Sequence, residues 1–259
     1  MSRKFVFILI NLACASTCIS QNVSPFFDQC LQVPEYGFYQ NRLNQTIECY
    51  RSYLITGIPE RGVPSFDPLK SNLSEINIDN PLIYTDIKLK DVEINGLTDF
   101  EIKEISSKRT FYPSEENQEY IEYYFKFITF DAEYKGKANF FGLTSYAGKG
   151  RLVITLKGVS LETTTSYQTK SPMIKDFHAN VHVGNATVYV SGVQGGEDLS
   201  TLVSVALSRM MQYIFDTFPE RVSSIVNEMG LMMLNKLYED IRYEDYRNAI
   251  LTSNCKRKL

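Results

Sequence analysis

Residues 120–134, YIEYYFKFITFDAEY, are the stretch of sequence that decides the fold. Apolar and polar side chains alternate along it, and this pattern is typical of a β-strand with one buried face. The alternation changes phase inside the run, because large apolar residues occupy odd positions as far as Phe127 and even positions from Phe130 onward. A β-bulge produces such a change and bends a sheet. The stretch therefore predicts a long and strongly curved strand.

Alternation of the same kind extends to both sides, from about residue 74 to residue 191. Tyr, Phe, Ile, Val and Thr dominate the alternating segments, as they do in strands generally. Turns that contain glycine separate the segments, so this part of the chain predicts an antiparallel sheet of long, curved strands. The segments are DIKLKDVEI (86–94), DFEIKEI (99–105), GRLVITLKGVSLE (150–162), DFHANVHV (176–183) and ATVYVSG (186–192).

The regions before and after the strands have a helical period. Residues 40–56 place apolar side chains at helical spacing, and Gly57 is suited to cap the end of that helix. From about residue 197 onward apolar residues recur at i, i+3 and i+4, and this period continues beyond Pro219. We therefore expect Pro219 to bend the helix rather than end it. The predicted fold class is α+β, with a highly curved antiparallel β-sheet wrapped around one long, proline-kinked C-terminal α-helix.

The sequence contains no recognisable catalytic motif. The patterns GxSxG, HExxH, GxGxxG and the Walker loop are all absent. The two histidines, His178 and His182, lie on a predicted strand, where four residues span about 13 Å, too far for two ligands of one zinc ion. We expect both histidines to face solvent, and we expect neither enzymatic activity nor a metal or other cofactor.

The first twenty residues have the layout of a secretory signal peptide. Arg3 and Lys4 precede the apolar run FVFILINLACA, which small residues follow and which is too short to span a bilayer. We expect cleavage near Ser20 and a single domain over residues 21–259. No later stretch is apolar over a length that would cross a membrane.

The composition and charge are those of an ordinary globular protein that is slightly acidic. Hydrophobic residues make up 44% and charged residues 22% of the 259 residues, and the formal net charge is −3. Loss of the signal peptide removes Arg3 and Lys4 and makes the remaining chain more acidic. An acidic chain is a poor candidate for binding nucleic acid or an anionic membrane surface. We therefore expect no nucleic-acid partner and no stable membrane insertion.

Three cysteines remain once the signal peptide is removed. Cys30 and Cys49 are natural disulfide partners in an oxidising compartment, and closing that loop would stabilise the fold by about 3 kcal/mol. Cys255 is left in a polar tail, so we expect a monomer in which Cys255 is either free or available to join a second chain. The candidate glycosylation sites, which fit secretion, are the sequons at Asn44, Asn72 and Asn185.

The segment GIPERGVPSFDPLK (57–70), which we call the strap, has three prolines and two glycines, so no regular helix or central strand can run through it. A GIPE–GVP–DPL run after a short helix resembles the insect takeout and haemolymph juvenile hormone-binding protein family. The resemblance extends from about Cys30 to Tyr246. The further segments that resemble the family, in order, are VEINGLTDFEIKEI (92–105), FDAEYKGKANFFGLTSYAGKGRLVITLKGVSLE (130–162) and VHVGNATVYVSG (181–192).

The resemblance implies one half of a tubular lipid-binding fold, in which the strap ties the N-terminal helix to the first strand over one end of the sheet. It also implies a protein secreted into haemolymph or another extracellular fluid. Such a protein carries a small hydrophobic ligand, of the fatty acid, terpenoid or juvenile hormone type, in an internal apolar tunnel. The candidate lining residues are Phe100, Phe125, Phe127, Phe140, Phe141, Tyr146, Leu156, Met210, Met211 and Phe215.

The residues themselves give the carrier hypothesis some support. Aromatic residues make up 13% of the chain, and methionine, which adapts to irregular ligand shapes, is concentrated in the long helix. The alternative is an extracellular interaction protein of the same fold that carries nothing, and an exposed apolar patch would favour it. The methionines of the helix are Met210, Met211, Met229, Met232 and Met233.

Overall fold

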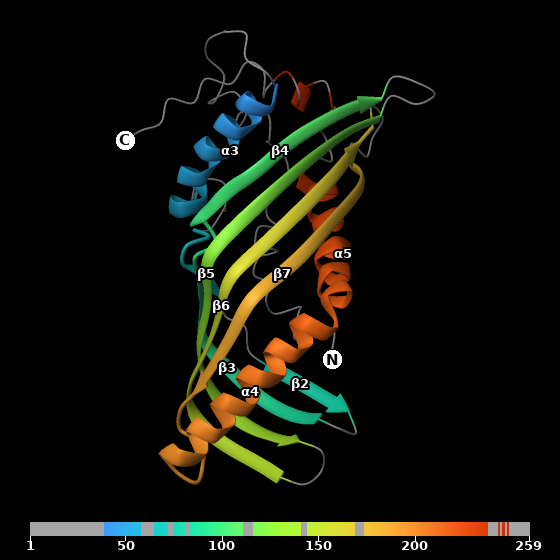
Figure 1. Cartoon of the computed structure of the whole chain (residues 1–259). Coiled ribbons are helices and arrows are strands. Elements are labelled where there is room, and N and C mark those ends of the chain that lie inside the picture. Colours follow the sequence, from blue (N-terminus) through green and yellow to red (C-terminus); the bar gives the residue numbers. More distant parts are fainter. Residues whose placement is uncertain are drawn as a thin grey trace.

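The protein is described here from a computed structural model, which is elongated and has its sheet curved along two successive helices (Figure 1). The predicted signal peptide, Cys30, Cys255 and the sequon at Asn72 lie outside the described residues, as does the side chain of Cys49, so the expected disulfide is not among the contacts below. The structure describes residues 39–57, 65–71, 75–80, 83–110, 116–140, 144–168 and 174–237, together with 243, 245, 246 and 248.

The predicted order of a helix, a sheet and a final helical region is confirmed. Gly57 follows the first helix with φ of 69°, a conformation that suits glycine at a helix C-terminus. The elements are α3 (Tyr39–Thr56), β1 (Leu69–Ser71), β2 (Glu75–Asn80), β3 (Ile83–Asn95), β4 (Phe100–Thr110), β5 (Glu116–Phe140), β6 (Thr144–Tyr167), β7 (Ile174–Val190), α4 (Glu197–Thr217) and α5 (Pro219–Leu237).

The strands form one antiparallel sheet, seven-stranded in the described part of the chain, with the order β1-β3-β5-β6-β7. Strand β5 is 25 residues long and pairs with β4 along its first half and with β3 along its second half, while β2 pairs with β3. The expected long, curved strands are therefore confirmed, and the sheet curls so that one face looks toward α4 and α5 (Figure 1).

The change of phase in β5 has a different cause from the expected bulge. The register between β5 and β6 is unbroken along their whole length. The register between β6 and β7 is also unbroken around Gly158, where β6 lies beside the phase change in β5. Instead, β5, β6 and β7 each place two successive residues on the outer face, and the three pairs lie side by side across the sheet. In β6 one of the two is Gly158, which has φ of 61°. We call this row the crease. Its residues are Lys126 and Phe127 in β5, Lys157 and Gly158 in β6, and Gly184 and Asn185 in β7.

True bulges do occur, but in the strands that flank β5. The register of β3 against β5 shifts between Lys90 and Glu93, and that of β4 against β5 shifts between Ile102 and Glu104. Asp91, inside the first of these shifts, has φ of 49°, in the left-handed region that few residues other than glycine adopt. The curvature of the sheet therefore has two sources: a crease through β5, β6 and β7, and single bulges in β3 and β4.

The predicted bend in the C-terminal helix is confirmed. Phe218, with φ of −129° and ψ of 46°, is the only residue that separates α4 from α5, and its N–H donates to the carbonyl of Ile214 at 3.0 Å. A residue that precedes proline is disfavoured in the helical region, whereas proline itself fits the first turn of the next helix. The two helices therefore follow one another with a change of direction (Figure 1).

Replacement of Pro219 by alanine is expected to lower the free energy of unfolding by about 1 kcal/mol. Pro219 occupies the first position of α5, where proline is well tolerated, so alanine gains little helix propensity there. Alanine would release the backbone restriction at Phe218 and allow α4 to continue straight, away from the partners of α5 on β7. Urea denaturation of the two proteins measures the difference. An unchanged or higher unfolding midpoint would contradict this account of the bend.

Side chains from α4 and α5 pair with the open edge of β7 between Ala179 and Val190, and with Val193 just beyond the strand. Strand β7 is the last strand of the sheet in the described part of the chain, where no other strand pairs with its outward N–H groups. Ser204 shows the arrangement: its Oγ accepts from the Val190 N–H at 2.8 Å and donates to the carbonyl of Ser200 at 2.8 Å. We call this row the polar seam. Its members are Ser200, Ser204, Ser208, Gln212, Ser223 and Asn227, which accept from the N–H groups of Val193, Val190, Val188, Ala186, Val181 and Ala179.

The described end of the strap is fixed by one carboxylate. Asp67 accepts from the N–H of Gly96 at 2.9 Å, from the N–H of Thr98 at 3.2 Å and from the Thr98 hydroxyl at 2.8 Å. Gly96 has φ of 90°, and a Cβ there would lie 2.2 Å from the carbonyl oxygen of Phe127. Two segments that resemble the family, the strap and the turn after β3, therefore contact each other directly. Leu69, at the end of the strap, is fully buried.

Candidate functional site

The interior between the inner face of the sheet and the helices is lined by a continuous series of apolar clusters. The first, which we call the α4 cluster, joins β3, β5, β6, β7 and α4. The central cluster lies at the level of the crease, and the tyrosine cluster lies at the other end, beside α3. Representative members are Leu89, Ile94, Phe130, Val190 and Val203 in the α4 cluster, Phe100, Phe125, Val159, Val183 and Ala186 in the central cluster, and Leu43, Tyr167, Ile174, Tyr243 and Tyr246 in the tyrosine cluster.

The inner face of β6 is incompletely covered. Strand β6 lies between β5 and β7, where inward side chains of a tightly packed core would be fully buried. Large aliphatic side chains on this face nevertheless remain only half-buried while packing against the clusters. They are Leu152, Ile154, Leu156 and Leu161. The interior therefore keeps accessible apolar surface in the middle of the sheet.

Helix α4 supplies the opposite wall of the interior. Met211 packs against both the α4 cluster and the central cluster, and Phe215 packs against the central cluster. Both side chains are half-buried. Because methionine has an unbranched, flexible side chain, Met211 can adapt to different shapes at the junction of the two clusters. This wall and the half-buried face of β6 define the candidate binding region.

The structure brings together half of the ten residues proposed to line the tunnel. Phe100 and Phe125 are buried in the central cluster with their ring centroids 5.9 Å apart. Leu156, Met211 and Phe215 pack against the same cluster. Met210 is half-buried and belongs to none of the three clusters. Phe141 and the side chains of Phe140 and Tyr146 lie outside the described residues.

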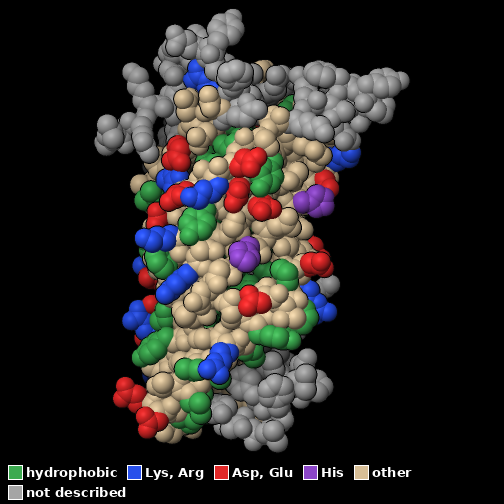
Figure 2. Space-filling model, viewed as in Figure 1, with side chains coloured by type: hydrophobic (Ala, Val, Ile, Leu, Met, Phe, Trp, Pro, Cys, Tyr) green, Lys and Arg blue, Asp and Glu red, His purple; other side chains and the backbone are tan. Residues whose placement is uncertain are grey.

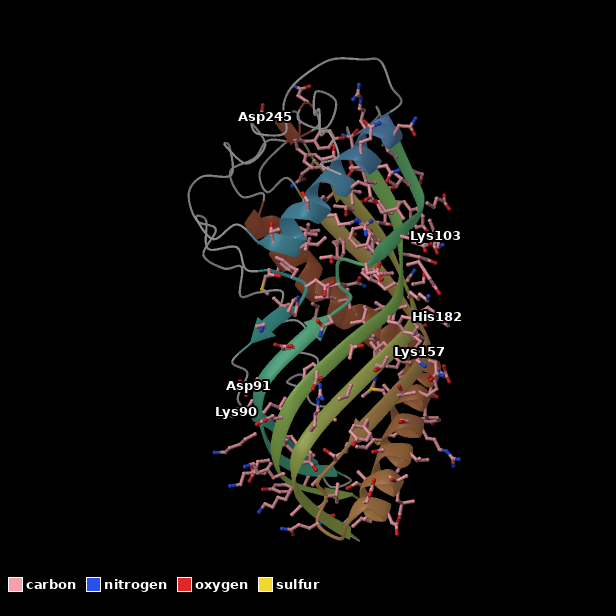
Figure 3. All side chains as sticks on the ribbon, turned by 90° about the vertical axis from the view of Figure 1, so that its left-hand side faces the viewer. Lys90, Asp91, Lys103, Lys157, His182 and Asp245 are labelled. Carbon is pink, nitrogen blue, oxygen red and sulfur yellow. The ribbon has the colours of Figure 1, made fainter. Side chains whose placement is uncertain are left out.

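Phe127 lies on the outer face of the sheet and not in the interior. Its side chain is 42% exposed, and the Nζ atoms of Lys126 and Lys157 lie 5.5 and 5.9 Å from its ring centroid. The crease explains this position, because two successive residues of β5 point outward there. Lys157 and His182, which are labelled in Figure 3, are also exposed and occupy outward positions of β6 and β7.

Sequence reasoning missed the polar end of the interior. Glu119 is only 2% exposed, and its Oε2 accepts from the Tyr167 hydroxyl at 2.7 Å and from the Tyr246 hydroxyl at 3.0 Å. Asn117, two residues earlier on the same face of β5, is also buried. The alternating pattern continues through these positions with polar residues, and that continuation is the signal that could have revealed them. The interior is therefore apolar along most of its length and polar beside the tyrosine cluster.

A half-open groove of about 730 Å³ follows the polar seam on its outer side. The exposed flank of α4 forms one wall with Thr201, Val205 and Arg209, and the end of β7 forms the other with Tyr189. These helix residues lie on a different side of α4 from Val203, which points into the interior. The groove is thus separated from the candidate binding region by the polar seam.

Tyr134 helps to hold the end of the α4 cluster. Its hydroxyl donates to the carbonyl of Ser191 at 2.9 Å, and burial raises the pKa of this tyrosine above its usual value. The phenol therefore stays neutral and remains a donor as the pH rises through the range in which an exposed tyrosine begins to ionise. Tyr134 thus links the middle of the sheet to the turn that precedes α4.

The two histidines lie on the outer face of β7. His178 and His182 are exposed, as expected, and Nε2 of His178 lies 2.7 Å from a carboxylate oxygen of Asp176. No group of three or more His, Cys, Asp or Glu side chains within the described residues has metal-binding geometry. On the face shown in Figure 2, acidic and basic side chains are interspersed over the strands.

Comparison with known proteins decides the family. The family model for haemolymph juvenile hormone binding protein matches residues 7–247. The chain belongs to the haemolymph juvenile hormone-binding protein family. This match spans most of the sequence and includes all of the elements described above. The family resemblance noted from the strap and the strand segments is thereby confirmed.

Solved structures place this family member in a known fold. Takeout 1 from Epiphyas postvittana matches with a TM-score of 0.53 and 15% sequence identity, over 77% of this chain and 93% of that protein. A lipopolysaccharide binding protein gives a TM-score of 0.34 at 10% identity, over 78% of this chain and 38% of that protein. No curated protein sequence matches this chain. The similarity to Takeout 1 shows that the curved sheet with its C-terminal helices is the Takeout fold.

None of the described helices combines the length and the apolar character that a membrane-spanning helix needs. Helix α4, for example, places the serines of the polar seam along one flank.

Proposed function

We propose that this member of the haemolymph juvenile hormone-binding protein family carries a small hydrophobic ligand between the sheet and helices α4 and α5. The observation that carries the proposal is the half-buried inner face of β6, which offers apolar surface inside the molecule rather than on its outside. The membership of the family supports the same function. Burial of a sixteen-carbon chain there would contribute on the order of 10 kcal/mol before entropy costs, at about 0.8 kcal/mol per CH₂.

Replacement of Leu156 by tryptophan is expected to weaken ligand binding at least about tenfold, because the larger ring would fill space that the ligand needs. The matched control is Thr155→Trp, which adds the same ring to the outer face of β6 one residue away. Titration with a neutral fluorescent naphthylamine reporter measures the affinity of each variant. Equal affinities for the two variants would contradict a binding region at Leu156.

A second candidate function is that of an interaction protein that carries nothing. The outer flank of α4 favours it, because Leu202 and Tyr213 are 61% and 60% exposed there. Extraction of the protein from its native source, followed by mass spectrometry, separates the two functions. A co-purified lipid supports the carrier, whereas a lipid-free extract together with no binding of the reporter would leave only the interaction protein.

We further propose that the chain is exported, loses residues 1–20, and forms the disulfide Cys30–Cys49, with Cys255 outside any intrachain bond. Export would place the protein in haemolymph or a similar fluid, where glycosylation at Asn185 would project from the outer face of β7. Peptide mapping without reduction is expected to yield one linked pair of Cys30 and Cys49 peptides. A peptide that links Cys255 to either of them would contradict the proposal.

A further inference from the structure

The polar end of the interior contains a buried donor whose hydrogen-bonding capacity is unused. Asn117 is 4% exposed, and its Nδ2 has no hydrogen-bond partner within the described part of the chain. Its position in β5 is directly opposite Tyr167 in β6, so both side chains lie on the inner face. A buried amide N–H without an acceptor is unfavourable, and native proteins rarely leave one unless a water molecule or ligand supplies the acceptor.

The same end also contains a buried acid. Glu119 lies two residues after Asn117, on the same face of β5, and accepts hydrogen bonds from the hydroxyls of Tyr167 and Tyr246. An oxygen that accepts two such bonds is well suited to the ionised carboxylate. A second carboxylate brought beside it in a buried site would be repelled, because like charges interact strongly where water is excluded.

An apolar path leads away from this polar end along β5. Ile121, Tyr123 and Phe125 continue the inner face and pack against the tyrosine and central clusters. From Asn117 to Phe125 the strand spans about 26 Å, which is long enough to lie beside an extended alkyl chain. The interior thus has the polarity of an amphiphile, with a short polar end and a long apolar body.

We infer that Asn117 and Glu119 receive the head group of the ligand and select a neutral head group with an oxygen acceptor, such as an amide or ester carbonyl, over a carboxylate. This inference rests on the proposed carrier function. The Asn117 Nδ2 donates to the ligand oxygen, and the charge of Glu119 disfavours an anionic head group at that position. The bound class is therefore long-chain neutral amides or esters rather than free fatty acids.

Competition between two ligands of nearly equal shape tests the inference. Dodecanamide and dodecanoate differ in charge at the head group and share the same alkyl chain. Each is titrated against the bound naphthylamine reporter with the full-length protein and the variants Glu119→Gln, Asn117→Leu and Glu122→Gln. Glu122 is the matched control, because it lies on the outer face of β5 and contacts Ser160. The reporter itself is neutral and needs no head-group contact.

The wild type is expected to bind dodecanamide about tenfold more tightly than dodecanoate. Glu119→Gln should bring the two affinities together by strengthening dodecanoate, and Asn117→Leu should weaken dodecanamide about tenfold. Glu122→Gln should leave the ratio unchanged. If the reporter binds but the amide-to-acid ratio is the same in all proteins, the head-group inference is overturned and the carrier function stands. If neither reporter nor ligand binds to the wild type, the carrier function itself is overturned.

Discussion

Replacement of Asp67 by alanine is expected to lower the free energy of unfolding by about 4 kcal/mol, since hydrogen bonds to a charged group contribute about 1.5–3 kcal/mol each and do not add fully. The carboxylate accepts from three donors in the turn after β3: the N–H groups of Gly96 and Thr98 and the Thr98 hydroxyl. Alanine would leave all three without this acceptor. The strap would also lose its attachment to the sheet at this point.

Two further variants make the Asp67 result specific. Asp67→Asn keeps one acceptor oxygen and is expected to cost about half as much. Asp99→Ala removes a carboxylate that is exposed near the same turn and is expected to change stability by less than about 0.5 kcal/mol. Equilibrium denaturation in urea measures all three. Similar losses for Asp67→Ala and Asp99→Ala would show that the Asp67 carboxylate does not hold the strap.

Removal of two hydroxyls from the polar seam is the second large effect that we expect. Ser204→Ala leaves the buried N–H of Val190 without its partner, which costs about 1–3 kcal/mol, and the double variant with Ser208→Ala is expected to lose about 4 kcal/mol in total. Alanine has the better helix propensity, so a loss of stability cannot come from the helix itself.

Neighbouring serines in α5 supply the control for the seam. Ser223 Oγ accepts from the N–H of Val181, whereas Ser224 is exposed. Ser223→Ala is expected to destabilise the protein, and Ser224→Ala is expected to be neutral or slightly stabilising because of its helix propensity. Hydrogen exchange at Val181 and Val190 gives an independent measurement. Unchanged exchange in the seam variants would mean that other contacts protect the edge of β7.

The order of elements could be predicted from the sequence because each element has its own period. The switch from period two to the helical period separated β7 from α4, and Pro219 identified the bend before α5. The sequence was a poorer guide to which face of the sheet each side chain occupies. Phe127 was assigned to the interior because the alternation before it points inward, whereas the crease turns it outward. A local pattern shows that the phase changes but not which residue begins the new phase.

The polar parts of the candidate site were hidden for a different reason. Serine in a helix is usually a surface residue, so the sequence predicts no structural role for Ser200, Ser204 and Ser208, although they recur at every fourth position. Their partners are backbone groups of another element, which a sequence does not reveal. Glu119 and Tyr246 are likewise distant in sequence, and only the fold brings them into one hydrogen-bonded group.

The polar seam joins two elements whose repeats differ in length. Four residues of helix rise about 6.0 Å, whereas two residues of strand rise about 6.6 Å, so each step of the seam adds a mismatch of about 0.6 Å. A straight helix would therefore drift out of reach of a straight strand after a few steps. Gln212 is the last seam member in α4 and Ser223 the first in α5. The bend at Phe218 lies between these two helix residues, and the crease at Gly184 lies between their partners on β7, Val181 and Ala186. The helix and the strand therefore change direction at the same level, which restores their alignment. Neither break can be moved along the chain without moving the other.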